Sequence, residues 1–200
     1  MRSILVLVFV LILVSVPAVG QTLATAETAG SGKTAVVGMY DRDYAGAWLD
    51  GRFAFVRGLS DSFDLYLLTG HTRVGGEGQW FIAGGGNLHL LGWQGTHLAV
   101  NPMIATPVTN RNKASVAWFN PALIVSQRLV GTKLIAYAAA NVVVPLGKTE
   151  RGVFTPAETY VNWPVGLAAT FGQWSVLAEF DIGGEKTRAV AIAVAYLLPK

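Results

Sequence analysis

The sequence predicts an all-β protein, namely a closed antiparallel up-and-down transmembrane β-barrel of about ten strands, within a range of roughly eight to twelve. After residue 33 the chain consists of strand-length runs in which apolar residues alternate with small or polar ones. The composition, with 52% hydrophobic and only 14% charged residues, is too apolar for an ordinary soluble domain of 200 residues. No later segment is apolar for long enough to form a spanning helix. A closed barrel leaves no backbone donor unpaired in lipid, so it is the β architecture that can cross a membrane.

The first twenty residues have the features of an export signal. Arg2 precedes a long apolar block, Pro17 interrupts it, and the small residue Gly20 stands at the expected cleavage site. The block is shorter than the roughly 20 residues that a retained spanning helix needs. We therefore predict a signal peptide cleaved after Gly20, with Ala26 as second choice, and localisation of the exported barrel in a bacterial outer membrane.

The domain organisation follows from this reading: residues 1–20 are the signal peptide, 21–33 a flexible linker rich in Ala, Thr, Ser and Gly, and 34–200 one barrel domain. Strand boundaries carry an error of about two to four residues. The predicted strands span 34–42, 47–57, 62–71, 79–91, 96–108, 115–128, 132–146, 158–171, 173–183 and 187–198. Tight turns alternate with longer polar connections, which is typical of barrels whose short turns face the periplasm.

Two faces can be separated in the strand next to the last. Trp174, Val176 and Phe180 share one face, whereas Glu179 and Asp181 share the other. Because carboxylates in contact with lipid are costly, this register directs Glu179 and Asp181 to the barrel interior.

An asparagine recurs on the predicted inward face of the fourth to eighth strands. The predicted polar band consists of Asn87, Asn101, Asn120, Asn141 and Asn162, together with Glu179 and Asp181. Amide side chains both donate and accept hydrogen bonds. The band therefore either lines a narrow passage for small polar solutes or forms a hydrogen-bonded ladder that closes the interior, and the sequence leaves both open.

Aromatic residues are placed as an interfacial belt requires. Phe63, Trp93, Phe171 and Trp174 lie beside the short turns, and Trp80, Trp118 and Phe119 lie near the opposite strand ends. The alternative is ordinary core packing in an exported soluble β-sandwich or barrel that binds a ligand, but such a fold needs more charged residues to coat its polar faces.

With these strands, turns and aromatic positions, residues 34–200 resemble the small bacterial outer-membrane β-barrel proteins. The alternating final strand matches that class, although the chain ends in Leu198-Pro199-Lys200 and not in an aromatic residue. The resemblance implies insertion by the barrel-assembly machinery and a role as a porin-like narrow passive channel or as a structural surface barrel. It leaves the oligomeric state open.

Cations recur in the long connections, on the side opposite the short turns. These residues are Arg42, Arg73, Arg111, Lys113, Lys148, Arg151, Lys186 and Arg188. Their charge suits the phosphates of an outer-leaflet glycolipid, so outer-membrane lipid and glycolipid are the expected partners. The alternative is that these loops are simply solvated.

Prolines at positions 102, 121, 145 and 164 fall inside predicted strands, where they cannot donate a ladder hydrogen bond. We expect them at bulges or at local gaps in the ladder.

Signals for catalysis, metals and cofactors are weak, and none of these is predicted. The chain has no cysteine, and the glycine-rich stretch 29–34 has Glu27 where a phosphate-binding loop requires glycine. Of the three histidines none pairs with another at ligand spacing, which leaves His89 with Glu179 or Asp181 as a conceivable acid–base set. A barrel enzyme acting on lipid is therefore a minor alternative.

Net charge gives no reason to propose a nucleic-acid partner. Removal of Arg2 with the signal leaves 14 of the 15 Lys and Arg residues against 12 Asp and Glu.

Overall fold

A computed structural model gives the structure of the protein and describes residues 27–43, 48–74, 77–108, 117–146, 159–182 and 189–199. Within these ranges, eleven strands form one antiparallel sheet. In the same residues no helix is long and apolar enough to cross a membrane.

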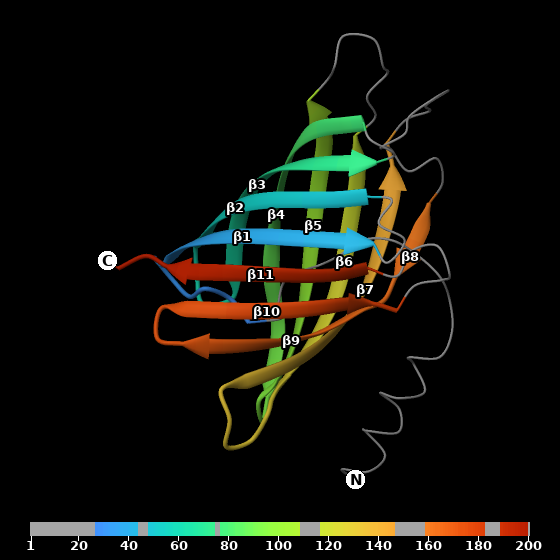
Figure 1. Ribbon diagram of the computed structural model, residues 1–200. Coiled ribbons are helices and arrows are strands. Elements are labelled where there is room, and N and C mark those ends of the chain that lie inside the picture. Colours follow the sequence, from blue (N-terminus) through green and yellow to red (C-terminus); the bar gives the residue numbers. More distant parts are fainter. Residues whose placement is uncertain are drawn as a thin grey trace.

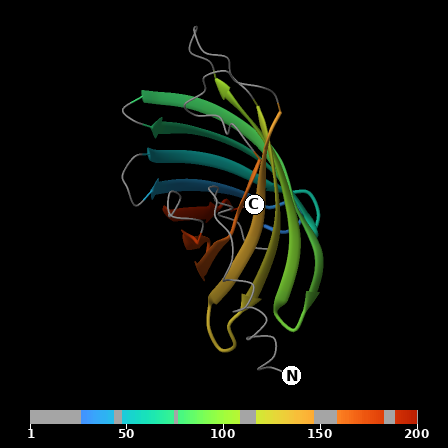
Figure 2. The same cartoon turned by 90° about the vertical axis from the view of Figure 1, so that its right-hand side faces the viewer.

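The sheet closes on itself as an up-and-down barrel (Figures 1 and 2). The strands are β1 (Thr34–Asp43), β2 (Trp48–Gly58), β3 (Phe63–Val74), β4 (Glu77–Trp93), β5 (Thr96–Val108), β6 (Trp118–Arg128), β7 (Leu134–Pro145), β8 (Tyr160–Asn162), β9 (Pro164–Phe171), β10 (Trp174–Asp181) and β11 (Ala189–Leu197). Strands next to each other along the chain pair around the wall, except that β8 and β9 both pair with β7, and β1 pairs with β11 to complete the ring. The predicted fold class is thus confirmed.

β8 and β9 together occupy one position in the wall. Both pair with β7 in the same register, and only Trp163 separates them. The described residues therefore form a barrel of ten strand positions, and the predicted strand 158–171 corresponds to the interrupted pair. The other predicted boundaries differ from the observed ones by a few residues only, the largest extension being the end of β3.

The prolines account for most irregularities of the wall. Pro102 and Pro121 face each other across β5 and β6, and the pairing of β6 with β7 lapses at Pro121. Pro164 follows the break at Trp163, and Pro145 is the last residue of β7. Pro121 and Pro164 thus lie at local gaps, as expected, because a residue without an N–H group cannot continue the ladder, whereas Pro145 lies at a strand end and not at a bulge or gap.

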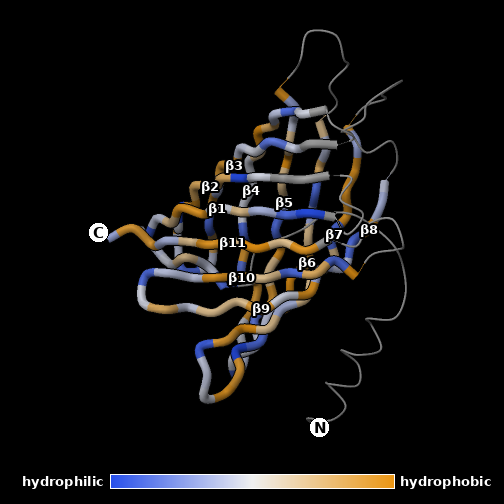
Figure 3. The backbone as a smooth tube through the Cα atoms, viewed as in Figure 1, coloured by the Kyte–Doolittle hydropathy of each residue, from blue (hydrophilic) through white to orange (hydrophobic). Residues whose placement is uncertain are grey.

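Apolar side chains cover the exterior of the barrel. In β10, Val176 and Phe180 are exposed whereas Leu177 and Glu179 are buried, so the predicted register of this strand is correct. Leu67 on β3 is 66% exposed. Hydrophobic residues recur along the strands in Figure 3. A surface of exposed branched and aromatic side chains around a closed sheet is that of a transmembrane barrel.

The short connections 59–62, 94–95, 129–133 and 172–173 all lie at one end of the barrel, which we call the turn end. Gln94 and Gly95 both have positive φ angles, 48° and 81°. Two such central residues are the requirement of the tightest two-residue hairpin turn, and glycine adopts this conformation without strain. The connections at the opposite end, which include the two-residue connection 75–76 between β3 and β4, lie mostly outside the described residues.

Glycines on the interior face give room to tyrosines that reach across a neighbouring strand. The ring of Tyr137 on β7 lies over Gly166 on β9, and its hydroxyl donates a hydrogen bond of 2.7 Å to Glu179 Oε2 on β10. A Cβ atom at Gly166 would lie 2.4 Å from the ring carbon Cζ. The same arrangement recurs at Gly85, where the hydroxyl of Tyr66 passes over β4 and donates to Asn101 Oδ1 on β5 at 2.7 Å.

A third interior glycine lies between an arginine and a phenylalanine on the two neighbouring strands. Gly70 on β3 separates Arg52 on β2 from Phe81 on β4, and the guanidinium carbon of Arg52 lies 5.7 Å from the centre of the Phe81 ring. Arg52 also forms an ion pair of 2.9 Å with the fully buried Asp41. Side chains of this kind pack the interior and connect strands that are not direct neighbours.

Replacement of Gly166 by valine should destabilise the barrel, because the added side chain displaces Tyr137 and its hydrogen bond to Glu179. We expect a loss of about 1–3 kcal/mol in the free energy of unfolding, measured by urea unfolding of the protein in lipid vesicles. Gly38→Val is the matched control, since nothing lies within 4 Å of the position that a Cβ at Gly38 would take. Equal unfolding midpoints for the two variants would contradict the inference that the packing of Tyr137 over Gly166 stabilises the interior.

Candidate functional site

The asparagines of the predicted polar band all lie buried on the interior face. Exposed fractions range from 0% at Asn162 to 8% at Asn101 and Asn120. Asn141 on β7 stands directly opposite Asn162 on β8, and Asn101 and Asn141 each stand opposite Ala122 of β6. The structure therefore brings Asn101, Asn141 and Asn162 into one row across β5 to β8, whereas Asn120 stands opposite Met103.

The amides of this row do not form a continuous hydrogen-bonded ladder among the described residues. Asn101 accepts a hydrogen bond from Tyr66, and Asn87 donates to the backbone carbonyl of Glu27 at 3.3 Å. By contrast Asn120 Oδ1 and both amide atoms of Asn141 and of Asn162 are buried without a hydrogen-bond partner. Such groups are available to water or to a small polar solute, and burial without any partner costs each of them about 1–3 kcal/mol.

The two carboxylates of the band are also buried, with Glu179 fully enclosed and Asp181 3% exposed. Glu179 accepts the hydrogen bond from Tyr137. His89 forms its contact with another histidine, described below, and so the conceivable acid–base set with Glu179 or Asp181 is not assembled.

Most residues of the predicted aromatic belt lie on the exterior. Trp80, Trp93, Phe171 and Trp174 are each more than half exposed, and Phe63 is partly exposed.

Trp118 is the exception, and its prediction is wrong. Its ring lies 6.0 Å from the Phe81 ring and packs against the buried interior cluster. Side chains alternate along a strand, so Trp118 shares the inward face with Asn120. Of the two adjacent aromatic residues, Phe119 is the one that points outward.

At the turn end, the segment Glu27–Lys33 is hydrogen-bonded to the barrel, and we call it the N-terminal strap. The amide of Gly32 donates to the Gly58 carbonyl, and the amide of Gly58 donates to the Lys33 carbonyl, both at 2.9 Å. The amide of Ala29 donates to Asp64 Oδ2 at 2.8 Å. This differs from the flexible linker expected over residues 21–33, of which 21–26 lie outside the described residues.

The packing of the N-terminal strap against the end of β2 requires glycine at position 58. A Cβ atom there would lie 2.0 Å from the carbonyl oxygen of Gly30, a distance that no side chain tolerates. The end of β2 thus accepts the strap only because Gly58 has no side chain.

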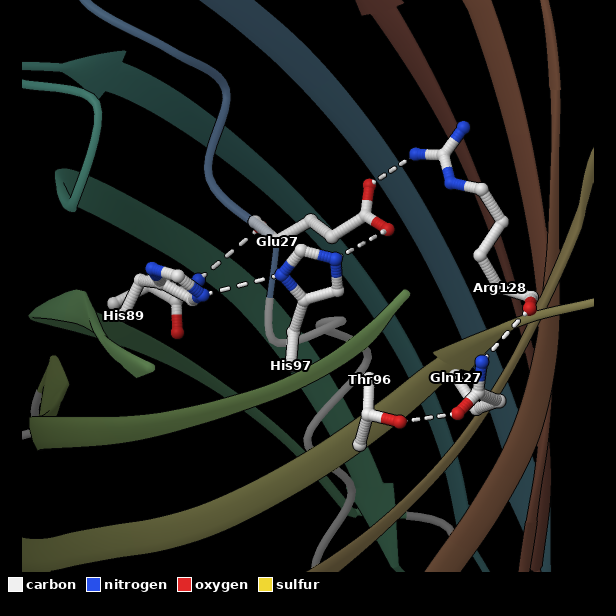
Figure 4. Close-up of polar contacts among 7 residues, drawn as sticks. Glu27, His89, Thr96, His97, Gln127 and Arg128 are labelled. Carbon is white, nitrogen blue, oxygen red and sulfur yellow. Dashed lines mark hydrogen bonds and ion pairs between the residues drawn. The ribbon is translucent and has the colours of Figure 1, made fainter. Parts of the chain in front are cut away.

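The strap places the carboxylate of Glu27 among basic side chains at the barrel mouth (Figure 4). Arg128 Nη2 at the end of β6 lies 2.7 Å from Glu27 Oε2, and His97 Nε2 on β5 lies 3.7 Å from Glu27 Oε1. The Glu27 side chain is only 22% exposed, whereas that of Arg128 is 56% exposed. The contact to Arg128 is a charge-assisted hydrogen bond, the stronger kind in proteins.

His97 is in turn hydrogen-bonded to His89, with 3.1 Å between His97 Nδ1 and His89 Nε2. The sequence shows no two histidines at ligand spacing, and this contact across two strands was not predicted from it. A register shift between His89 and Leu91 leaves Leu90 as the extra residue of β4 and places Gly92 opposite His97. Both imidazoles come close to the position that a Cβ at Gly92 would occupy, so this glycine leaves the space in which they meet.

Backbone and side-chain contacts hold Arg128 in place. Its amide donates to the Gly95 carbonyl at 2.8 Å, and its own carbonyl accepts from Gln127 Nε2 at 3.0 Å. Gln127 Oε1 accepts a hydrogen bond from the Thr96 hydroxyl. These contacts hold the backbone of Arg128 at the mouth and connect the ends of β5 and β6.

Sequence reasoning missed this group. The alternation of β4 and β5 already placed Asn87, His89 and His97 on inward faces, so a signal for the histidine pair was present. The positions of Glu27 and Arg128 carried no such signal, because Glu27 precedes the first strand and Arg128 flanks a turn.

In the part of the chain that the structure describes, no group of three or more His, Asp or Glu side chains is arranged to hold a metal ion. Of the loop cations predicted to meet glycolipid, only the side chain of Arg42 is described, and it is exposed.

The sequence matches no protein-family model and no curated protein. Similar solved structures include a barrel from the de novo design of transmembrane β-barrels, at 12% identity over 86% of this chain and 99% of that one with a TM-score of 0.43. The N-terminal β-barrel domain of Pseudomonas aeruginosa OprF is 12% identical over 84% of this chain and 99% of that chain, with a TM-score of 0.46. The translocator domain of the autotransporter NalP from Neisseria meningitidis is 12% identical over 84% and 88% of the two chains, with a TM-score of 0.45. These likenesses concern the barrel architecture alone.

Proposed function

We propose that this protein is a bacterial outer-membrane barrel that acts as a structural surface protein, with its interior closed to solutes by its own side chains. The short-turn end faces the periplasm in this proposal, and the exterior contacts lipid acyl chains. Insertion by the barrel-assembly machinery and contact of the loops with glycolipid belong to the same proposal.

The observation that carries it is the burial of inward side chains all around the wall. Interior residues that are at most 2% exposed lie on nine of the eleven described strands, among them Asp41, Ala54, Ala99, Ile124, Tyr137, Asn141, Asn162, Pro164, Glu179 and Ala191. A water-filled passage at this level would leave such side chains accessible to solvent. The tyrosines that cross over Gly85 and Gly166 fill the space that a pore would need.

The second candidate function is a narrow passage for small polar solutes. The unpaired amides of Asn141 and Asn162 and the unpaired amide oxygen of Asn120 favour it, because buried polar groups of this kind require water or a solute as partner. Small side chains beside them, such as Ala122 and Ala139, leave little steric obstruction once water enters.

A charge on the exterior face tests the membrane environment. Leu67→Arg at the exposed middle of β3 should lower the free energy of unfolding in lipid vesicles by about 2–4 kcal/mol, whereas Leu59→Arg in a short turn should lower it by about 0–1 kcal/mol. A soluble sandwich would tolerate both changes equally, since an exposed leucine faces water there. Equal unfolding energies for the two variants would therefore contradict the membrane proposal.

Solute uptake separates the two candidate functions. Liposomes that contain the purified barrel should swell in small sugars no faster than empty liposomes, because the interior is closed. Swelling above that background would overturn the structural role and favour the passage. In that case Asn120→Leu, which removes an unpaired amide oxygen from the interior, should lower the swelling rate.

A further inference from the structure

The polar group at the turn-end mouth has the composition of a receptor for a single carboxylate, which Glu27 occupies. We propose that Arg128 and His97 form a carboxylate-binding site that fastens the N-terminal strap across the mouth. We further propose that this site binds small free monocarboxylates when Glu27 is removed.

The two donors converge from neighbouring strands onto the two oxygens of one carboxylate. Arg128 contacts Oε2 at 2.7 Å, and His97 Nε2 faces Oε1 at 3.7 Å. Oε1 is buried and accepts no hydrogen bond in the described residues. A small movement of His97 or of the Glu27 carboxylate toward the other completes a second hydrogen bond. The site therefore binds one carboxylate oxygen through Arg128 and has a second donor, His97, close to the other oxygen.

The contact between the histidines is compatible with a proton on Nε2 of His97, because either imidazole can be the donor of this hydrogen bond. Each neutral imidazole has one N–H donor and one bare nitrogen. When His89 Nε2 donates across the 3.1 Å contact, His97 accepts at Nδ1 and keeps its own proton on Nε2. That proton points toward Glu27, so a neutral His97 serves as a donor to the carboxylate.

The strap brings Glu27 to this site in a fixed position. Its backbone is hydrogen-bonded to Gly58 on β2 and Asp64 on β3, and the Glu27 carbonyl accepts from Asn87 on β4. An exposed ion pair on a mobile segment contributes little to stability. Here the carboxylate is mostly buried and its backbone is held on three strands, which lowers the entropy that is lost on binding.

Removal of the carboxylate should therefore release the strap and open the interior of the mouth to solvent. Ser126 is a suitable reporter, because it is 1% exposed and stands opposite His97 on the inward face of β6. The chain contains no cysteine, so Ser126→Cys introduces a single thiol. Its reaction with a small charged thiol reagent measures access to the mouth in the full-length barrel in lipid vesicles.

In the Ser126→Cys background, Glu27→Ala should raise the labelling rate at least about tenfold, the factor expected when a charge-assisted contact no longer opposes local opening. Acetate replaces the heavy atoms that this substitution removes, so excess acetate should bind the vacant site, as seen by isothermal titration. Acetamide, which has the same shape and no charge, should not bind. Lys133→Gln, in an exposed turn at the same end, is the control and should label at the parent rate.

Two results would overturn the proposal: a labelling rate unchanged by Glu27→Ala, or acetate that binds no better than acetamide. Faster migration of the unboiled protein on a denaturing gel checks that each variant is folded. If Glu27→Ala does not fold, Gly58→Val displaces the strap by collision with Gly30 and leaves the carboxylate receptor intact. It should raise labelling in the same way, and parent-like labelling would again reject the proposal.

Discussion

The structure depends on one constraint: within lipid, each backbone N–H group must find its acceptor inside the protein. Pairing of β1 with β11 removes the two sheet edges that an open arrangement of these strands would leave. The alternation of side chains then follows, because a closed wall has one face for acyl chains and one for the interior. The same constraint explains why prolines matter here, since each one removes a donor from the wall.

The wall is not uniform around the ring. Pairing between β1 and its two neighbours, and between β2, β3 and β4, runs without a lapse. The prolines that face each other, the break at Trp163 and the unpaired amides lie together on β5 to β9. One side of the barrel is therefore a regular ladder, and the other combines missing donors with buried polar side chains. Water or a solute that enters the interior would be stabilised on the second side.

The interior and the mouth of the barrel are closed by different kinds of interaction. Inside the wall, glycines allow tyrosines to reach across a strand and bind an acceptor on the next one, so shape complementarity fills the space. At the turn end, a backbone segment docks against Gly58 and a carboxylate meets a cation. Closure of the interior depends on packing and is independent of salt. Closure of the mouth depends on a partly exposed ion pair, which salt weakens.

The sequence alone determined the barrel, its strand number and the faces of most strands, because alternation is a local property that each strand shows by itself. It also placed the five asparagines inward. Tertiary structure decided what those amides contact, since register between strands sets Asn101 beside Tyr66 and leaves Asn141 and Asn162 unpaired. Neither the strap nor the meeting of Glu27 with Arg128 was predictable from sequence. Residues 101 positions apart come together because the wall curves round and the N-terminal strap docks at the turn end.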